Sequence, residues 1–356
     1  MLGRRAMAAG NAMRYPPCAV LRNGRMRIRI AAVAAAVLFV GVLSYTPGCR
    51  DEPLVPGSVA QATPGASEAQ GASSDRSPSS PGSHAGEQTE GPDGGIYVWV
   101  PGGEFMMGSM ESDVQYAIAH FGTASAWLEN EKPVHKVRIT KGFWLGKHEV
   151  TNEQYAAFLN AYGGNRDSEG HELLDMARQY SEIEKHGGRY TAKSGREQHP
   201  VVEVSWYGAT EYCRHHGLRL PTEAQWEYAA RGPKALRYPW GDAWDEKRCC
   251  AGTNRKQYSG AKTFAVGSFA DGATWCGALD MAGNVSEWCR DWYDNSYYAT
   301  SPMTDPTGPA TGTFRLMRGG SWCSNGNGCR SASRAECYPD RTLFGLDFGF
   351  RCLMTP

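Results

Sequence analysis

Apolar residues in this chain gather in short runs that end at turn-forming residues. The clearest run is Ile-Tyr-Val-Trp-Val at 96–100, which Pro101-Gly102-Gly103 follows directly. Aromatic and β-branched residues bounded by Pro and Gly predict a β-strand. The same pattern predicts further strands at 134–140, 143–145, 201–204 and 314–317.

Helices are predicted from their first residues. The runs Thr151-Asn152-Glu153-Gln154 and Thr222-Glu223-Ala224-Gln225 share one arrangement, a Thr followed three positions later by a Gln. In such a capping box the Thr hydroxyl accepts a hydrogen bond from the Gln amide, and the Gln side chain reaches back. We expect the first helix to end near Gly163-Gly164 and the second at Gly232-Pro233, because Gly terminates helices readily.

A third helix is predicted between these two. Ser205 is placed to cap it, and the helix should run towards Gly217 and carry Cys213 in its last turns. The sequence contains no internal repeat of 20–50 residues. Short helices, scattered strands and long connections indicate a single α+β domain with little regular secondary structure.

Composition and charge narrow the class of partner. The chain has 356 residues, 41% of them hydrophobic, which is enough for a substantial core. Lys and Arg number 37, as do Asp and Glu, so the formal net charge is zero. No global field attracts the chain to nucleic acid or to an anionic membrane surface. We therefore expect no nucleic-acid partner.

The N-terminal region, residues 1–48, has the features of a signal peptide or membrane anchor. Arg27 and Arg29 precede an apolar run at 30–45, and Gly48-Cys49 follows it. A basic flank and an apolar stretch of this length are typical of an export signal. Cys49 at this position suggests lipidation, and a start at Met13 or Met26 would give a leader of more usual length. The sequence predicts an exported cell-envelope protein, attached to a membrane only through this end.

Residues 49–94 are rich in Ser, Gly, Pro and Ala and contain very few large apolar side chains. Such a segment cannot bury enough surface to offset the entropy lost on ordering. We predict a disordered linker between the leader and a folded domain at 95–356. Outside the cytoplasm, the ten cysteines from Cys49 onward would be able to form disulfides.

Several blocks in this domain make the chain resemble the formylglycine-generating-enzyme family, also called sulfatase-modifying factors. They occur in the family's order and are Pro101-Gly102-Gly103-Glu104-Phe105-Met106-Met107-Gly108-Ser109, Glu149-Val150-Thr151-Asn152-Glu153-Gln154-Tyr155, His199-Pro200-Val201-Val202, Leu220-Pro221-Thr222-Glu223-Ala224-Gln225-Trp226-Glu227-Tyr228, Pro239-Trp240-Gly241, Asp280-Met281-Ala282-Gly283-Asn284-Val285, Arg318-Gly319-Gly320-Ser321-Trp322 and Gly349-Phe350-Arg351. The resemblance implies a compact α+β fold that is related to C-type lectins.

The resemblance also implies a redox site. Active members bind Cu(I) through two cysteines after the Gly-Gly-Ser-aromatic block and oxidise a sulfatase cysteine to formylglycine with O₂. Soft thiolates select Cu(I), so two sulfurs must converge on one ion. The candidate catalytic residues are Cys323 and Cys329, one residue further apart than the family pair. The alternative is that these cysteines are structural, either in a disulfide or as buried thiols.

A disulfide between Cys213 and Cys352 is implied by the resemblance, because active members join cysteines at both positions. The family's other bridge would need cysteines where this chain has Ala230 and Ser331. The pairing of the remaining cysteines is left open by the sequence; they are Cys249, Cys250, Cys276, Cys289, Cys323, Cys329 and Cys337.

A calcium site is implied by the run that begins at Asp280. Carried over residue by residue, the ligands are the side chains of Asp280 and Glu287 and the main-chain oxygens of Gly283 and Val285. Calcium prefers oxygen ligands, and two nearby carboxylates repel each other unless a cation lies between them. The alternative is a solvated turn with Glu287 in an ordinary ion pair.

Two functions follow from these observations. The first is a divergent oxidoreductase or protein-modifying factor that acts on a protein or peptide substrate. The second is a non-catalytic binding or scaffolding lipoprotein with the same fold. The spacing of Cys323 and Cys329 favours a family member without true formylglycine-generating activity.

Overall fold

A computed structural model describes residues 81–252, 262–340 and 347–356 of the chain. The leader, Cys49 and the linker up to residue 80 lie outside the described residues. In the described part, no helix is long and apolar enough to span a membrane. The folded region begins earlier than the predicted boundary at residue 95, because strand β1 (Gln88–Glu90) already pairs with β2 (Ile96–Val100).

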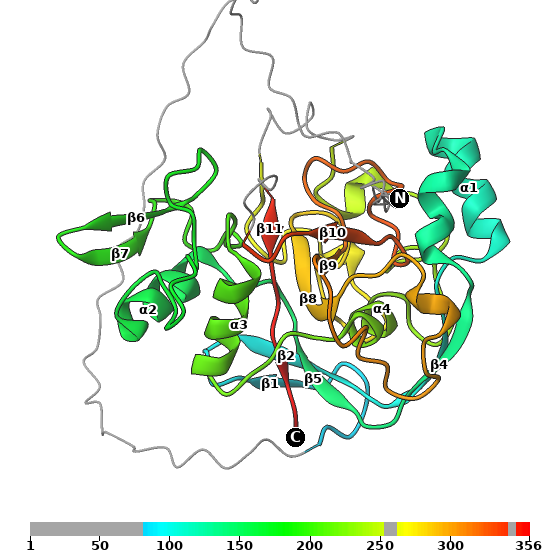
Figure 1. The fold of residues 1–356 in the computed structure, drawn as a ribbon, viewed down its shortest axis with the longest axis horizontal. Helices are drawn as coiled ribbons and strands as arrows, with labels where there is room; N and C mark the ends of the chain where they lie inside the picture. Colours follow the sequence, from blue (N-terminus) through cyan, green and yellow to red (C-terminus); the bar gives the residue numbers. More distant parts are fainter. Residues whose placement is uncertain (1–80, 253–261, 341–346) are drawn as a thin grey trace, which may run out of the picture. The chain divides into compact units, whose positions relative to one another are not determined.

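Short elements and long connections make up the fold, as the sequence predicted (Figure 1). The other strands are β3 (Gly103–Met107), β4 (His135–Ile139), β5 (Phe143–Gly146), β6 (Ile183–His186), β7 (Arg189–Ala192), β8 (Ser286–Trp292), β9 (Arg315–Arg318), β10 (Ala335–Cys337), β11 (Phe348–Gly349) and β12 (Leu353–Met354). The α-helices are α1 (Glu111–Phe121), α2 (Asn152–Tyr162), α3 (Trp206–His215) and α4 (Glu223–Arg231). Short 3₁₀ helices are η1 (Ser125–Glu131), η2 (Glu246–Arg248), η3 (Ala270–Gly272) and η4 (Tyr297–Ala299).

Two four-stranded sheets form the framework. The first has the order β1-β2-β5-β12 and is antiparallel throughout. The second has the order β10-β9-β8-β11, in which β11 runs parallel to β8. The two-stranded ribbons β3-β4 and β6-β7 complete the strand pairing among the described residues. This mixed arrangement confirms the α+β class.

The first sheet is buried on both faces. Successive side chains of a strand point to opposite faces. Along β2, Tyr97 and Trp99 therefore enter one apolar cluster together with residues of α2 and α3. Val98 and Val100 enter a second cluster with α4 and with strands β8 and β9. The sheet thus separates two cores and helps to hold α4 against the second sheet.

Helix boundaries follow the capping residues that the sequence indicated. The hydroxyl oxygens of Thr151 and Thr222 accept hydrogen bonds from the amides of Gln154 and Gln225, each at 3.3 Å. Gly163 ends α2 in the left-handed conformation, with φ of 88°. The predicted cap at Ser205 is also present, but α3 stops at His215, before Gly217.

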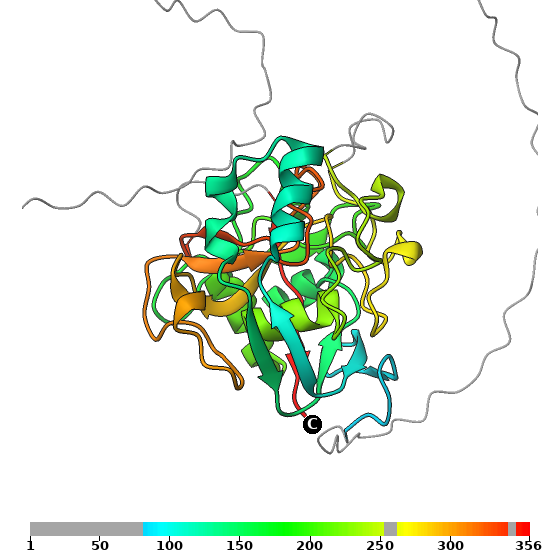
Figure 2. The same cartoon turned by 90° about the vertical axis from the view of Figure 1, so that its right-hand side faces the viewer.

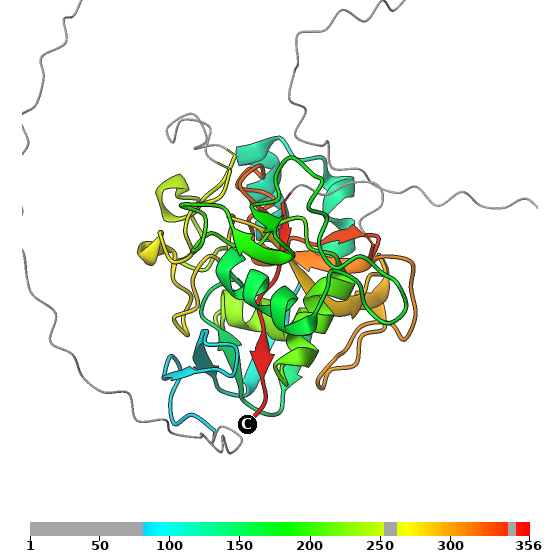
Figure 3. The ribbon, with the colours of Figure 1, turned by 90° about the vertical axis from the view of Figure 1, so that its left-hand side faces the viewer.

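One predicted strand is absent. Residues 201–204 form no strand in the described structure, although Val204 makes an isolated bridge with Leu174. Val201, Val202 and Val204 are buried from several sides, so their apolar character reflects core packing and not strand alternation. Helix α1 and the ribbon β6-β7 were not predicted, and they lie on opposite sides of the folded region (Figures 2 and 3).

A buried carboxyl group generates a pH prediction for the fold. Burial and then the nearby Glu223 carboxylate raise the pKa of Asp291 to about 7. An unfolded Asp has a pKa near 4, so between roughly pH 4 and pH 7 only the folded chain keeps this proton. The free energy of unfolding should therefore fall by about 3–4 kcal/mol as the pH rises through this window. Asp291→Asn should remove that part of the slope in denaturant titrations at several pH values.

The exposed Asp271 provides the matched control. Asp271→Asn should keep the wild-type pH dependence. An Asp291→Asn protein with the same slope as wild type would contradict the assignment.

Candidate functional site

Buried arginines fix the segment at 318–334, which carries both candidate catalytic cysteines. Arg318 donates to the main-chain oxygens of Ala332 and Ser333, at 3.0 and 2.9 Å, and pairs with the Glu227 carboxylate. Burial opposes ionisation of Glu227, but Arg318 and Arg231 hold its pKa below the usual value. The Gly-Gly-Ser segment after Arg318 therefore leaves the sheet from a fixed ionic anchor.

Two further arginines of this segment are anchored in the same way. Arg330 makes two hydrogen bonds of 2.7 Å to the two carboxylate oxygens of Glu131 in η1. Arg334 contacts both carboxylate oxygens of Glu223, at 2.7 and 3.1 Å. All four side chains are almost fully buried. A planar guanidinium facing a carboxylate in this manner fixes orientation as well as distance.

Cys323 lies half-buried near the start of the segment. Its sulfur is 3.3 Å from the hydroxyl oxygen of Ser321, and it donates to the Asp347 carboxylate at 3.4 Å. It packs against an apolar cluster that contains Cys250 and Trp322. One candidate cysteine therefore has polar neighbours and partial access to solvent.

Cys329 lies in a different place. It is fully buried and belongs to a separate cluster with Cys249, Ala251 and Ala282. The neighbouring Cys329 thiol and then burial raise the pKa of Cys249. The structure thus brings Cys329 together with Cys249 and places Cys323 in another cluster.

Backbone geometry explains this arrangement. Cys249 has φ of −157° and ψ of 164°, so the chain is extended at the vicinal cysteines. In an extended chain neighbouring side chains point to opposite sides. Cys249 consequently faces Cys329, whereas Cys250 faces the cluster that Cys323 packs against. The sequence left these pairings open because vicinal cysteines alone do not show which side each one faces.

The predicted disulfide partners lie next to each other. Cys213 on α3 and Cys352 beside β12 are both buried, and their sulfur atoms are 3.2 Å apart. A disulfide bond is close to 2.05 Å long, so the sulfurs are in contact without being bonded, and both are thiols in this structure. Burial and then Cys213 raise the pKa of Cys352. The Cys213–Cys352 disulfide stays a prediction, and the structure places the two sulfur atoms next to each other.

The predicted calcium ligands lie where several carboxyl groups meet one arginine. Glu287 is fully buried; its oxygens accept hydrogen bonds from Arg351, both at 2.7 Å, and from the Trp226 indole at 2.8 Å. Asp280 accepts a hydrogen bond from the Gly267 amide at 2.6 Å. Burial raises the pKa of Asp280 to about 6, against the opposing effects of Gly267 and Arg351.

Glu149 adds a third carboxyl group to this region. Burial, then Asp280 and Glu287, raise the pKa of Glu149 well above its usual value. One of its oxygens, Oε1, is buried and has no hydrogen-bond partner among the described residues. Three acidic groups facing one guanidinium leave excess negative charge in a buried space, which a proton or a cation must offset.

Glu287 is held in an ion pair with Arg351, the partner expected under the alternative to a calcium site, although the pair is buried. Asp280 has an oxygen beyond its contact with Gly267, and Gly283 takes the left-handed conformation, with φ of 82°, that shapes the loop. Within the described residues, no three His, Cys, Asp or Glu side chains form a metal site by themselves. The predicted set adds the main-chain oxygens of Gly283 and Val285 to the side chains of Asp280 and Glu287. The calcium and copper assignments remain predictions.

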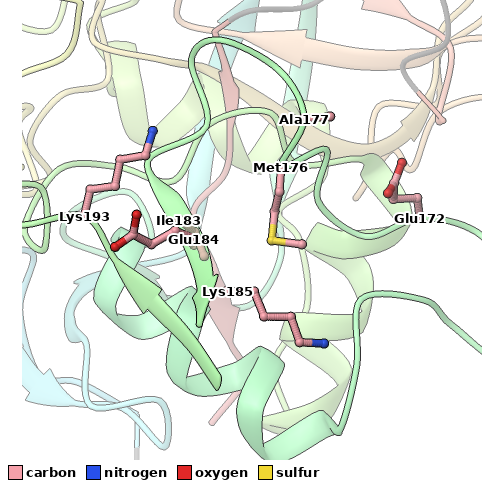
Figure 4. Close-up of a pocket in the computed structure, with 7 residues that line it drawn as sticks. All are labelled: Glu172, Met176, Ala177, Ile183, Glu184, Lys185 and Lys193. Carbon is pink, nitrogen blue, oxygen red and sulfur yellow. The ribbon is translucent and has the colours of Figure 1, made fainter. Parts of the chain in front are cut away.

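The structure also has a surface hollow of about 490 Å³, whose lining residues are drawn in Figure 4. It lies between the ribbon β6-β7 and the segment at 172–177, and none of the predicted site residues lines it. Its lysines already have partners, because Lys193 donates to the Ser181 carbonyl at 2.6 Å and Lys185 to the Tyr190 hydroxyl at 3.0 Å. We do not assign the site to this hollow.

Comparison with known proteins identifies the family. Residues 84–356 match the protein family described as the sulfatase-modifying factor enzyme 1-like domain. The formylglycine-generating enzyme of Streptomyces coelicolor is 36% identical over 294 residues, which cover 72% of this chain and 88% of that enzyme. This chain belongs to the formylglycine-generating-enzyme family.

Relatives in this family differ widely in the rest of their chains. The serine/threonine-protein kinase pkn1 of Chlamydia pneumoniae is 39% identical over 258 residues, or 72% of this chain. The match covers only 37% of that kinase, so this chain spans little more than a third of the length of such relatives. Similarity to this chain is thus found both in an enzyme of comparable length and in a much longer protein with another name.

Two solved structures share the fold. PvdO from Pseudomonas aeruginosa has a TM-score of 0.59 at 22% identity, over 77% of this chain and 100% of that chain. Treponema denticola variable protein 1 has a TM-score of 0.53 at 23% identity, over 74% and 95% of the two chains. At this level of identity the likeness concerns the fold alone.

The carboxyl cluster generates a stability prediction. If Asp280 and Glu287 hold calcium, a chelator should lower the melting temperature by about 5–10 °C, because a ligand at one hundred times its Kd stabilises by about 2.7 kcal/mol. Asp280→Asn should remove this response, whereas Glu169→Gln, at a residue with an exposed side chain, should keep it. Identical melting curves of the wild-type protein with and without chelator would refute the calcium site.

The adjacent sulfurs of Cys213 and Cys352 generate a second prediction. A peptide map of the alkylated protein without reductant should contain a linked pair of peptides carrying these cysteines. The bond would close a loop between residues 139 positions apart and stabilise the chain by about 4–5 kcal/mol in the chain-entropy model. Recovery of both cysteines as alkylated thiols would show that the bond is absent.

Proposed function

We propose that this chain is a non-oxidase member of the formylglycine-generating-enzyme family that binds a protein or peptide partner at the cell envelope. The observation that supports the proposal is the position of Cys329. Its thiol is in contact with Cys249 in a buried apolar cluster, and Cys323 packs elsewhere. The residues that would have to form a copper pair thus have other neighbours.

Cu(I) binding by two cysteines requires both sulfurs to reach the same ion as thiolates. The Cys323 thiol lies beside the Asp347 carboxylate, and a thiolate there would face a negative charge. Cys329 is fully buried among Cys249, Ala251 and Ala282, in a different cluster from the one that Cys323 packs against. The two sulfurs thus have different surroundings, and the pair has one more intervening residue than the family pair.

A surface suited to a polypeptide partner lies beside the same segment. We use the name aromatic face for the partly exposed side chains of Tyr116, Phe121, Trp240 and Trp244. The rings of Phe121 and Trp244 are 6.2 Å apart, and Gly326 of the anchored segment lies directly against both. Large aromatic side chains that combine apolar area with few rotatable bonds are enriched at protein interfaces.

The enzymatic alternative has support of its own. The 36% identity with the Streptomyces coelicolor enzyme covers most of that enzyme's length. Under this alternative the chain would oxidise a peptidyl cysteine, and Cys323 with Cys329 would supply the copper ligands. The two functions differ in one measurable reaction.

We expect no such oxidation. The purified protein would be loaded with Cu(I), supplied with O₂ and a sulfatase-derived cysteine peptide, and the peptide followed by mass spectrometry for conversion of thiol to aldehyde. The Streptomyces coelicolor enzyme provides the positive control. Wild type and the Cys323→Ser, Cys329→Ser double variant should both give the background rate.

Conversion by the wild type that disappears in the double variant would overturn the proposal and establish an oxidase. Competition with a colorimetric Cu(I) chelator gives an independent readout. The wild type and the double variant should lose copper to the chelator at the same chelator concentration.

A further inference from the structure

We propose that Cys249 and Cys329 form a disulfide when the protein folds under oxidising conditions. This bond is separate from the predicted Cys213–Cys352 pair, and it goes beyond the proposed function. It would tie the segment that carries Trp240 and Trp244 to the arginine-anchored segment at 318–334. The geometry of both segments carries the inference.

The vicinal cysteines present only one sulfur to Cys329. Because the backbone at Cys249 is extended, Cys249 faces the cluster of Cys329 and Ala282, and Cys250 faces away from it. The Cys250 sulfur is 3.6 Å from the main-chain oxygen of Lys262. The extended backbone therefore determines that Cys249, and not Cys250, meets Cys329.

Main-chain contacts hold the Cys249 side of the pair in place. The Gly252 amide donates to the Ser324 carbonyl at 2.6 Å, and the Asn284 amide donates to the Cys250 carbonyl at 2.8 Å. A Cβ at Gly283 would come within 2.2 Å of that same carbonyl oxygen, so the loop at 280–287 packs closely against the vicinal cysteines. This segment has little room to move away from the loop at 320–329.

The Cys329 side is held by ionic and main-chain contacts. The next residue, Arg330, forms the bidentate pair with Glu131. The Cys329 amide donates to the Asn325 carbonyl at 3.2 Å, and the Ser331 amide donates to the Arg237 carbonyl at 2.8 Å. With both backbones fixed, the two thiols meet in a cluster whose other buried members are Ala251 and Ala282.

The chemistry is a two-electron oxidation by thiol–disulfide exchange. One cysteine, as thiolate, attacks a sulfur of a small disulfide such as oxidised glutathione and releases one glutathione thiolate. The second cysteine then attacks the mixed disulfide, forms the Sγ–Sγ bond and releases the second glutathione. The two cysteines lose two protons and two electrons, and oxidised glutathione is reduced to two thiols. Burial afterwards shields the bond from reductants.

The bond would hold the aromatic face in place. It joins residue 249 to residue 329, and the Tyr238 hydroxyl, which precedes the closed loop, already donates to the Gly326 carbonyl within it at 2.9 Å. Trp240 stacks on Tyr238, with ring centroids 5.4 Å apart. Covalent closure would therefore order Trp240 and Trp244 relative to the segment at 318–334.

The test is a peptide map of the full chain refolded in a glutathione redox buffer, alkylated without reductant and digested. We expect a linked peptide pair that contains Cys249 and Cys329 and that disappears on reduction. Because Cys249 is followed directly by Cys250, fragmentation of the linked pair must locate the bond. Cys250→Ser should preserve the link, and Cys249→Ser should abolish it.

Stability gives a second readout. In the chain-entropy model, opening a loop of this size lowers the melting temperature by roughly 5–15 °C. The double variant Cys249→Ser, Cys329→Ser should therefore melt lower than the oxidised wild type by that amount. The control is the double variant Cys250→Ser, Cys276→Ser, which changes two cysteines outside the pair. Reductant should lower its melting temperature by as much as it lowers that of the wild type.

Three outcomes would overturn the inference: alkylated Cys249 and Cys329 thiols in the folded oxidised protein, a bond from Cys329 to Cys323, or a bond from Cys329 to Cys250. They are distinguishable from failure of the proposed function. Free thiols without oxidase activity would leave the non-oxidase proposal intact, whereas copper-dependent oxidation lost in the Cys323→Ser, Cys329→Ser variant would refute both.

Discussion

Buried pairs between arginine and glutamate hold together a fold that has little regular secondary structure. Arg318, Arg330, Arg334 and Arg351 are each at most 1% exposed, and each meets a buried carboxylate. A buried ion that loses its partner costs about 3–5 kcal/mol, so each pair strongly restricts where its two segments can lie. Three of the pairs join the segment at 318–334 to α4 and η1, and the Arg351–Glu287 pair reinforces the pairing of β11 with β8.

The arrangement of cysteines depends on this restriction. The two thiols of the segment at 318–334 lie between fixed arginines, so their directions are set before any metal or disulfide is considered. The extended backbone at Cys249 then determines which sulfur meets Cys329. A family of proteins can retain these anchors and vary the side chains between them, so that a shared fold carries different chemistry.

Much of the fold was predictable from local sequence. Thr151, Ser205 and Thr222 start helices because their hydroxyls satisfy main-chain amides, and those signals are confined to a few residues. Helix α1 was missed because its N-cap residue is Met110, which makes no side-chain capping hydrogen bond. The strand predicted at 201–204 was wrong because burial from several sides and strand pairing produce the same apolar run.

The site was predictable only in part. Block order identified the family and hence the fold, and that resemblance drew attention to Cys323, Cys329, Asp280 and Glu287. Glu149 had no local signal, since its role as a third acidic group depends on packing against residues more than 130 positions away. The contact of Cys329 with Cys249 is likewise long-range, and no spacing rule within one segment predicts it.

A double-mutant cycle on Arg330 and Glu131 measures whether buried ion pairs fix the segment at 318–334. Unfolding free energies of Arg330→Met, Glu131→Gln and the double variant would be measured in denaturant. Each single change should be strongly destabilising, and the coupling energy should be about 2 kcal/mol or more. A coupling energy within about 0.5 kcal/mol of zero would contradict this expectation, because the two side chains would then contribute independently.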